Sequence, residues 1–340
     1  MRVVYVVLTF LVFSQVVKGQ TGGRSVFQIL DLAPSARTLA LGGKMISVQD
    51  SDVVLAQLNP SIAQSYSTHQ IAFNQSFYYT GSSYSTLSGT YHLSKQNITL
   101  IGGLQSLRHG DIQGADEYGN KTNSFSSSEN LISLGASKKL FDPLFIGINL
   151  KLVFSNIESY QSSGLGIDLG AFYKLKENKS LGLTVNNIGT QWSPYQNLKE
   201  NLPFDIRVGY TQRLEHVPFQ FSLTVHHLQK WNLRSIDEES TINVLGEPLP
   251  GPSAFSKDLD NIFRHFILNT EIFLGKNAPL RLRLSYNHQR HQELKDQSYR
   301  GFSGFGGGVG IQMSKLVIDY GLANYHLAGS VHAIGIAYRW

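Results

Sequence analysis

The chain has 340 residues, and only 16% of them are charged, against roughly 25% in ordinary soluble proteins. The formal net charge of +5 is spread along the chain without a basic run, which excludes a nucleic-acid partner recognised through a clustered basic face. Cysteine is absent, so disulfides, cysteine-ligated metals, thiol nucleophiles and lipid attachment through cysteine are excluded. The 32 glycines, 16 tyrosines and 19 phenylalanines suit a sheet that faces lipid.

Residues 1–19 have the features of a secretory signal peptide. Arg2 supplies a positive charge, residues 3–13 are almost wholly apolar, and Val17 and Gly19 occupy the −3 and −1 positions of a cleavage site before Gln20. The alternative is an N-terminal membrane anchor, but the apolar run is too short to span a bilayer. We therefore expect export and a mature chain that begins at Gln20.

Residues 20–68 precede the first expected strand. Within them, residues 51–66 carry Val53, Leu55, Leu58 and Ile62 in the pattern of a short helix that Pro60 interrupts. Two placements remain open for this segment. It could form a plug inside the mouth of the barrel that the rest of the chain predicts, or it could form a periplasmic arm.

Residues 69–340 alternate apolar and polar side chains with a period of two. Ile146 and Ile148 share one face of an expected strand, for example, while Asn149 and Lys151 lie on the other. The alternating segments are longer than most soluble strands and long enough for a tilted bilayer crossing. We count fourteen of them: 69–79, 83–93, 97–108, 130–140, 144–156, 162–175, 180–190, 204–214, 218–229, 262–275, 279–290, 304–314, 315–324 and 331–340.

The connections between these segments alternate in length. Every second connection is tight, as at 94–96, 141–143 and 313–315, and all the long ones (109–129, 191–203, 230–261 and 291–303) fall between them. Outer-membrane barrels place short turns in the periplasm and long loops outside. The sequence therefore predicts an all-β fold, a fourteen-stranded antiparallel transmembrane β-barrel of residues 69–340 with a short N-terminal plug-like segment, in the outer membrane of a Gram-negative bacterium.

The last residues resemble the C-terminal signal that barrel-assembly machinery reads. Ile336, Tyr338 and Trp340 stand at alternate positions and the chain ends on the aromatic residue. The alternative is a closing strand that merely happens to end in Trp.

Motifs for catalysis, cofactors and metals are missing. The glycine run 304–310 departs from the G-x-G-x-x-G phosphate-binding pattern and is better explained as small residues on a crowded barrel face. On regular strands, the side chains of His288 and His291 would point to opposite faces, and so would those of His226 and His227. We therefore predict no metal site. We expect the polar inward face to form a packed or narrowly hydrated interior, with a solute pathway as the alternative. The candidate inward-facing residues are Asp168, Lys174, Thr184, Asn186, Asp205, Arg207, Gln220, His226, Glu271, Arg281 and Arg283.

The longest connection, residues 230–261, is the candidate partner-binding loop. It places apolar residues among charged ones, as a protein-binding surface requires. The alternative is a mobile polar flap. The candidate contact residues are Trp231, Leu233, Ile236, Phe255 and Leu259.

Three motifs in the N-terminal segment carry a resemblance to a known family. The motifs are Leu-Ala-Pro-Ser-Ala-Arg at 32–37, Ala-Leu-Gly-Gly at 40–43 and Leu-Asn-Pro-Ser at 58–61. They resemble the opening of the PorV/PorQ proteins, which are fourteen-stranded barrels related to the FadL fatty-acid transporters. The family usually has Asn-Pro-Ala where this chain has Asn59-Pro60-Ser61. Residues 158–164 and the chain length favour the PorQ branch.

The resemblance implies a role without catalysis and without a cofactor. PorQ-like proteins belong to the type IX secretion system of Bacteroidetes, in a cell-surface attachment complex with a PorU-like sortase, PorV and PorZ. The family therefore implies that this barrel, set in outer-membrane lipid, holds a PorZ-like partner at the surface. The alternative is a FadL-like passive channel for hydrophobic small molecules, which the polar and glycine-rich inward positions disfavour.

Overall fold

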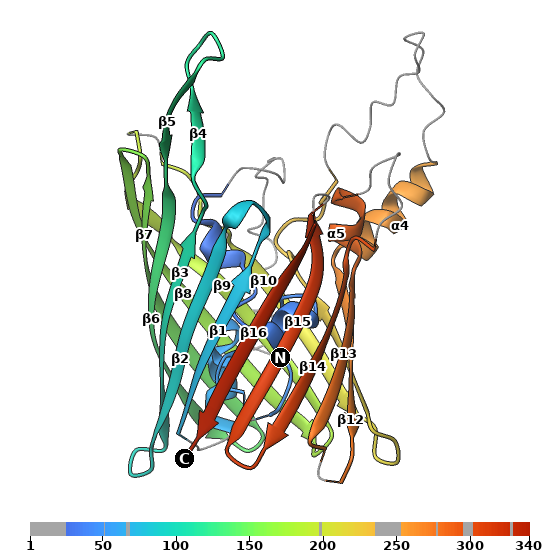
Figure 1. Cartoon of the computed structure of the whole chain (residues 1–340). Coiled ribbons are helices and arrows are strands. Elements are labelled where there is room, and N and C mark those ends of the chain that lie inside the picture. Colours follow the sequence, from blue (N-terminus) through green and yellow to red (C-terminus); the bar gives the residue numbers. More distant parts are fainter. Residues whose placement is uncertain are drawn as a thin grey trace, which may run out of the picture.

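The computed structural model describes residues 25–50, 52–65, 69–196, 199–234, 253–276, 278–294, 302–326 and 329–340. They form a closed barrel in which every strand pairs with antiparallel neighbours (Figure 1). The signal peptide expected at residues 1–19 lies outside the described residues. The barrel strands are β1 Gln70–Phe77, β2 Ser83–Leu93, β3 Ile98–Arg108, β6 Ser127–Phe141, β7 Leu144–Ile157, β8 Tyr160–Lys176, β9 Lys179–Ser193, β10 Asp205–Arg213, β11 Phe219–Val225, β12 Phe266–Leu274, β13 Leu280–Asn287, β14 Phe305–Met313, β15 Leu316–His326 and β16 Gly329–Arg339.

The fourteen barrel strands correspond one to one with the fourteen predicted segments, so the predicted fold class is confirmed. The ring closes where β16 pairs with β1, and there Ile336 lies opposite Phe73 and Tyr338 opposite Ile71. Closure leaves no strand edge in the barrel, which is the condition for placing a sheet in lipid. We refer below to the end with long connections as the loop end and to the other as the turn end.

The predicted faces are also confirmed. Leu150, Val208 and Leu284 are exposed on the outside of the wall, whereas Asn149 and Ser285, one position away, are buried inside. Outward apolar side chains in contact with lipid and inward polar ones are what the period of two dictates. Among the described residues, no helix combines the length and the apolar character needed to cross a membrane.

Three strand ends at the loop end fall three or four residues short of the predicted boundaries. Strand β11 ends at Val225, not at 229. Residues 262–264 belong to helix α4 (Ala254–Arg264), and β13 ends at Asn287 because helix α5 (His288–Glu293) begins there. The Asn287 side chain accepts a hydrogen bond from the backbone N–H of Arg290 at 3.1 Å and so caps α5, which stops the strand.

The structure also adds two short features that the alternation did not predict. A 3-10 turn, η3 (Tyr79–Gly81), connects β1 to β2. Within the long connection 109–129, strands β4 (Ile112–Ala115) and β5 (Lys121–Phe125) pair into a hairpin that rises above the barrel (Figure 1).

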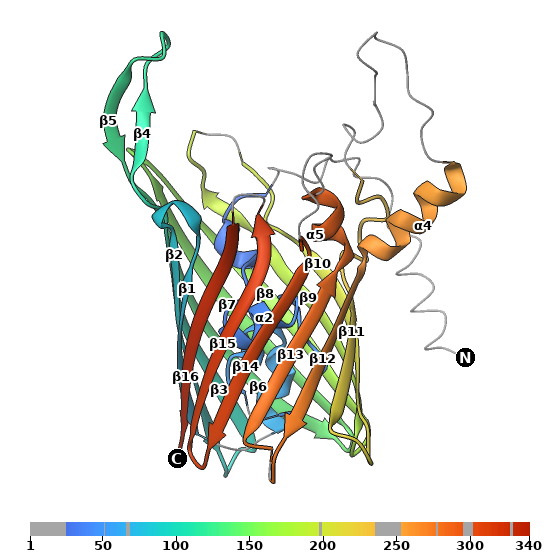
Figure 2. The same ribbon diagram turned by 45° about the vertical axis from the view of Figure 1, so that its right-hand side comes forward.

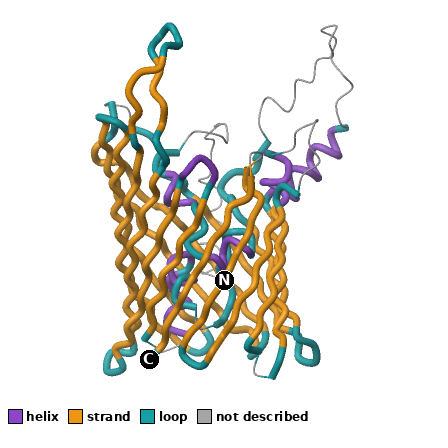
Figure 3. The backbone as a smooth tube through the Cα atoms, viewed as in Figure 1, coloured by secondary structure: helices purple, strands orange, loops and turns teal. Residues whose placement is uncertain are grey.

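The N-terminal segment lies inside the barrel, as the plug alternative expects (Figures 2 and 3). It comprises η1 (Gln28–Asp31), α2 (Ala36–Ala40), α3 (Leu55–Leu58) and η2 (Pro60–Ser65). At the loop end the Val26 N–H donates to the Asn201 carbonyl at 3.1 Å, and near the turn end the Gln64 Nε2 donates to Asn97 Oδ1 at 2.7 Å. The plug thus runs along the length of the lumen.

Helix α2 shows how the family-like motif residues shape the plug. The Ser35 hydroxyl accepts a hydrogen bond from the Thr38 N–H at 3.1 Å, and the Thr38 hydroxyl accepts one from the Ser35 N–H at 2.9 Å, which forms a reciprocal cap. Gly42 and Gly43 follow with φ angles of 87° and 91°, a conformation that favours glycine, and they end the helix. The chain can therefore turn within the confined lumen.

Glycines on the inner wall allow the plug to approach the sheet. A Cβ atom at Gly321 would lie 2.0 Å from the Ala36 carbonyl oxygen, and one at Gly182 would lie 2.1 Å from the Ile46 carbonyl oxygen. The glycine run 304–310 serves the same purpose, since a Cβ at Gly308 would lie 2.6 Å from the Ala40 Cβ. The crowded-face explanation of that run is confirmed, and the hydrophobic core of the molecule lies between plug and wall.

Candidate functional site

The contact between plug and wall is the first candidate site, and Arg37 of α2 is at its centre. The Arg37 guanidinium is buried and donates to both carboxylate oxygens of Glu271 on β12, at 3.1 and 2.5 Å. It also pairs with Asp50 and, at 3.3 Å, with Asp52. Arg283 on β13 binds the same Glu271 carboxylate at 3.0 Å. Glu271 therefore links the plug to the wall through two arginines.

A second set of ion pairs connects the plug to β10. Lys44 Nζ lies 3.0 Å from both Asp31 Oδ1 and Asp205 Oδ2. Arg207 Nε donates to Asp205 at 2.6 Å. Within the wall itself, Lys151 on β7 pairs with Asp168 on β8 at 2.6 Å. The expected pairing of opposite charges across the inward face is confirmed at Glu271 and Arg283, which face one another in the β12–β13 register.

One cavity inside the barrel is small. A cavity of about 20 Å³ lies between the plug and the wall, bordered by Ile29, Leu30, Leu58, Lys151 and Arg207 among others. That volume is enough for about one water molecule. With the buried apolar clusters between plug and wall, this small cavity fits the predicted packed or narrowly hydrated interior.

A larger depression lies on the outside of the wall. It has a volume of about 290 Å³ and an apolar lining that crosses β1, β2, β3 and β6. Gly89 and Gly102 face one another in the β2–β3 register, and a Cβ at Gly102 would meet no atom within 4 Å. The next residue, Gly103, faces inward, where a Cβ would lie 2.6 Å from the Gln57 amide nitrogen of the plug. The wall is thus thin at this point.

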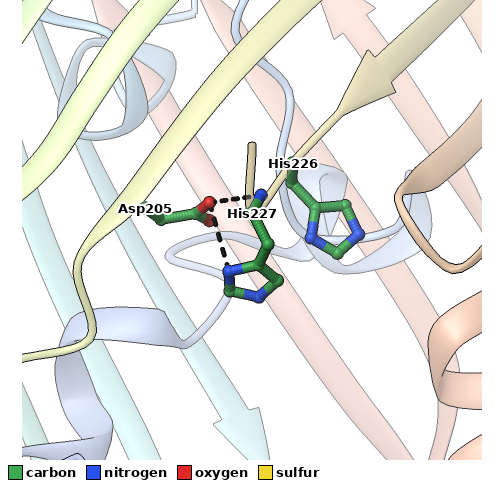
Figure 4. A group of neighbouring side chains, drawn as sticks. All are labelled: Asp205, His226 and His227. Atoms are coloured by element: carbon green, nitrogen blue, oxygen red, sulfur yellow. Dashed lines mark hydrogen bonds and ion pairs between the residues drawn. The ribbon is translucent and has the colours of Figure 1, made fainter. Parts of the chain in front are cut away.

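Asp205, His226 and His227 form a cluster at the loop end that the sequence did not predict (Figure 4). The expectation that the two histidines diverge is wrong, because β11 ends at Val225 and His227 adopts a φ of 55°. One ligand atom of each residue lies within 4.8 Å of the others. His226 is buried, and neither of its ring nitrogens has a hydrogen-bond partner in the described part of the chain.

The charges around this cluster oppose a metal ion. The Asp205 carboxylate already accepts hydrogen bonds from Lys44 and Arg207, and its other oxygen accepts the His227 N–H at 2.6 Å. A divalent cation would add two positive charges beside a buried lysine and arginine. Burial lowers the pKa of His227 to about 4, so its imidazole is neutral at pH 7. We assign the cluster to the ion-pair network of the plug.

The predicted partner-binding loop is only partly suited to that role. Trp231 and Phe255 are 69% and 72% exposed, and Leu259 is exposed as well. Leu233 is 1% exposed and packs inside the rim, so it cannot contact a partner in this conformation. Ile236 lies outside the described residues.

The β4–β5 hairpin is another feature of the loop end that the sequence did not predict. Tyr118 at its tip is 82% exposed. The Asp116 carboxylate orders the tip by accepting the N–H groups of Tyr118 at 3.0 Å and Asn120 at 2.8 Å. The signal that could have revealed it was the Asp-Glu-Tyr-Gly-Asn sequence at 116–120, which has the composition of a turn between short polar strands.

The proposed assembly signal lies on the outside of the closing strand. Ile336, Tyr338 and Trp340 are all exposed, and the Tyr338 and Trp340 rings stack at 6.1 Å. Trp340 also stacks on His69 at 6.1 Å. These three side chains are therefore accessible from the outside of the barrel. That the assembly machinery recognises them stays a prediction.

Comparison with known proteins adds information about the fold. Neither a family model nor a curated protein matches the chain. The structure is similar to the Pseudomonas putida toluene transporter TodX, with a TM-score of 0.57 at 14% identity over 92% of this chain and 99% of that one. It is also similar to the CymD monoaromatic hydrocarbon channel, with a TM-score of 0.54 at 12% identity over 93% of this chain and 99% of that one. A Pseudomonas aeruginosa FadL homologue is similar with a TM-score of 0.51 at 10% identity over 89% of this chain and 98% of that one. The shared fold is that of FadL-like outer-membrane barrels.

Proposed function

We propose that this chain is a sealed outer-membrane barrel that holds a protein partner at the cell surface and has no catalytic activity. The observation that carries the proposal is the packed lumen. Arg37, Lys44 and their carboxylate partners attach the plug to the wall, buried apolar clusters join the two, and the cavity between Ile29 and Arg207 has room for about one water molecule. A barrel filled in this way is suited to anchoring, because transport would require several buried ion pairs to separate.

The β4–β5 hairpin is the surface best placed to hold the partner. Among the described residues, this hairpin rises well above the rim of the barrel (Figure 3). It carries the exposed Tyr118 on an ordered turn. Tyrosine is enriched among the residues that dominate protein interfaces, because its ring buries a large area at a low entropic cost. We therefore place the main partner contact at Tyr118 and its neighbours on the hairpin.

The resemblance of the plug motifs suggests which assembly this is. PorQ-like barrels act in the type IX attachment complex of Bacteroidetes, so the proposed partner is a PorZ-like surface protein, with PorV and a PorU-like sortase in the same complex. The motif residues themselves serve the seal: Asn59 Nδ2 donates to the Ile46 carbonyl at 2.7 Å, and the Ser61 hydroxyl donates to Asn59 Oδ1 at 2.6 Å.

A passive channel for hydrophobic small molecules is the second candidate. The structural similarities favour it, since the similar proteins include a toluene transporter and a monoaromatic hydrocarbon channel. The apolar depression of about 290 Å³ outside Gly102 and Gly103 would give such a molecule a place beside the thin part of the wall. This function requires the plug to move.

One experiment separates the two candidates. Affinity capture from detergent-solubilised outer membranes, read by mass spectrometry, compares the wild type with Tyr118→Ala and with the matched control Tyr160→Ala, a second exposed tyrosine at the loop end. The anchor function predicts a surface partner that Tyr118→Ala loses and Tyr160→Ala keeps. If no partner is captured, and if toluene enters barrel-containing vesicles faster than empty ones, the channel function replaces it.

A further inference from the structure

Helix α4 has its apolar side exposed, which is the reverse of an ordinary surface helix. Phe255, Leu259 and Phe263 recur at every fourth residue, so they share one side of the helix, and all three are exposed. Asn261 and Arg264 on the opposite side are buried. A surface helix normally packs its apolar stripe against the core. Some apolar environment must therefore cover α4 from outside.

The polar side of α4 is fixed to the rim of the barrel. The Asn261 amide donates to the Trp231 carbonyl at 2.7 Å and accepts the Leu233 N–H at 2.9 Å. The Asp260 carboxylate lies 2.9 Å from Nε2 of His288 in α5. These contacts set the rotation of the helix about its own axis, so its apolar side cannot turn inward without breaking them.

The apolar side of α4 continues onto the lipid-facing wall. The Phe263 ring lies 6.3 Å from the ring of Phe266, the first residue of β12. Phe266 shares the outward face of β12 with the exposed Leu268, because Ile267 between them is buried inside. The stripe on the helix and the apolar band on the barrel thus form one surface.

The wall beside α4 is short. Strand β11 has seven residues and β12 has nine, whereas β8 has seventeen. At the usual rise and tilt, nine residues climb only about 21 Å, slightly less than the roughly 25 Å apolar band of such barrels. Only His265 separates α4 from β12. The helix, which projects sideways from the barrel in Figure 2, therefore begins at the height of the outer bilayer boundary.

From this geometry we propose that α4 is a membrane-surface helix whose Phe255, Leu259 and Phe263 side chains insert among the acyl chains of the outer leaflet. Lipid is the occupant because the stripe is continuous with a surface that lipid already covers, and helices of this amphipathic kind lie in the interface plane. Trp231, exposed beside α4, has the side chain that concentrates at membrane interfaces. The inference is independent of the proposed function, and it removes Phe255 and Leu259 from the predicted partner surface.

The absence of cysteine makes the test direct, because single cysteines can be introduced without background. Phe255→Cys, Leu259→Cys and Phe263→Cys variants of the full chain are labelled with a nitroxide and reconstituted in phosphatidylcholine vesicles. Asp258→Cys, an exposed position of the same helix outside the apolar stripe, is the matched control, and Tyr118→Cys on the hairpin reports full exposure to water. Collision rates with oxygen and with a water-soluble nickel chelate are then measured by electron paramagnetic resonance.

The proposal predicts a several-fold higher ratio of oxygen to nickel collisions at the three apolar positions than at Asp258→Cys, with the period of a helix along the segment. Equal access of nickel to all these positions, at the level of Tyr118→Cys, would overturn it. So would apolar positions that are wet in vesicles of the pure protein and become protected only in native outer membranes, because a protein partner would then cover the helix.

Discussion

Replacing Arg37 with methionine is the most direct test of the sealed lumen. The change keeps a long apolar stem but removes the guanidinium that contacts Glu271, Asp50 and Asp52. Glu271 retains Arg283 at 3.0 Å, so the carboxylate is not left wholly unpaired. Removing one partner of a buried ion pair costs about 3–5 kcal/mol. At about 1.4 kcal/mol per factor of ten, the equilibrium constant that favours the closed plug should fall by roughly two to four orders of magnitude.

The assay combines conductance in planar lipid bilayers with the urea midpoint of unfolding. We expect the wild type to show no steady conductance and Arg37→Met to show frequent openings and a lower midpoint. The double variant Arg37→Met with Glu271→Gln should lose less stability than the sum of the single variants, because the two side chains interact directly. Lys139→Met is the control: it breaks an exposed pair with Asp142 and should change stability by less than about 1 kcal/mol.

Two results would contradict the explanation of the seal. If Arg37→Met were as silent and as stable as the wild type, the ion pairs would not hold the plug. If the wild type itself conducted steadily, the packed lumen would not represent the protein in a bilayer.

Three further predictions concern the barrel. Leu284→Arg should destabilise the folded barrel by about 2–4 kcal/mol because it places a charge in lipid, whereas Tyr160→Arg at the loop end should cost less than about 1 kcal/mol; equal urea midpoints would reverse the assigned outer face. Deleting residues 338–340 removes the proposed assembly signal and shortens the closing strand, so we expect little protein in outer-membrane fractions on immunoblots; normal surface levels would show that the signal lies elsewhere. Burial lowers the pKa of His227 to about 4 from its ordinary 6.5. The contribution of neutral His227 to the free energy of unfolding should therefore be fully present above pH 6.5 and should fall by up to about 3 kcal/mol as the pH drops towards 4. His227→Gln should flatten that pH profile, and an unchanged slope would assign the effect to other groups.

The sequence by itself determined the barrel. Side chains on a strand alternate between two faces, so the placement of Leu150 outside and Asn149 inside follows from position alone. The barrel strands show the same alternation of apolar and polar residues in the sequence. Connection lengths are equally local, which is why the division into a loop end and a turn end could be stated without coordinates. The glycine run at 304–310 was explained by the same reasoning, since small inward residues imply something close to the wall.

The ends of the strands were less predictable. The sequence extended the ninth strand through His226 and His227, because alternation alone cannot show where pairing stops. The backbone at His227 turns to a φ of 55°, and the pairing partner of β11 begins only at Phe266. The two imidazoles consequently come together beside Asp205.

Only the tertiary structure decided how the plug, the network and the rim are arranged. Arg37 and Glu271 are 234 residues apart, and no local pattern records that one guanidinium joins them. The same holds for α4: its stripe of Phe255, Leu259 and Phe263 is visible in the sequence, but an amphipathic stripe ordinarily indicates the side that is buried. Asn261 and Asp260, through contacts with residues on other elements, turn the polar side inward. Periodicity is a property of neighbouring residues, whereas these orientations depend on contacts between residues that only the closed barrel brings together.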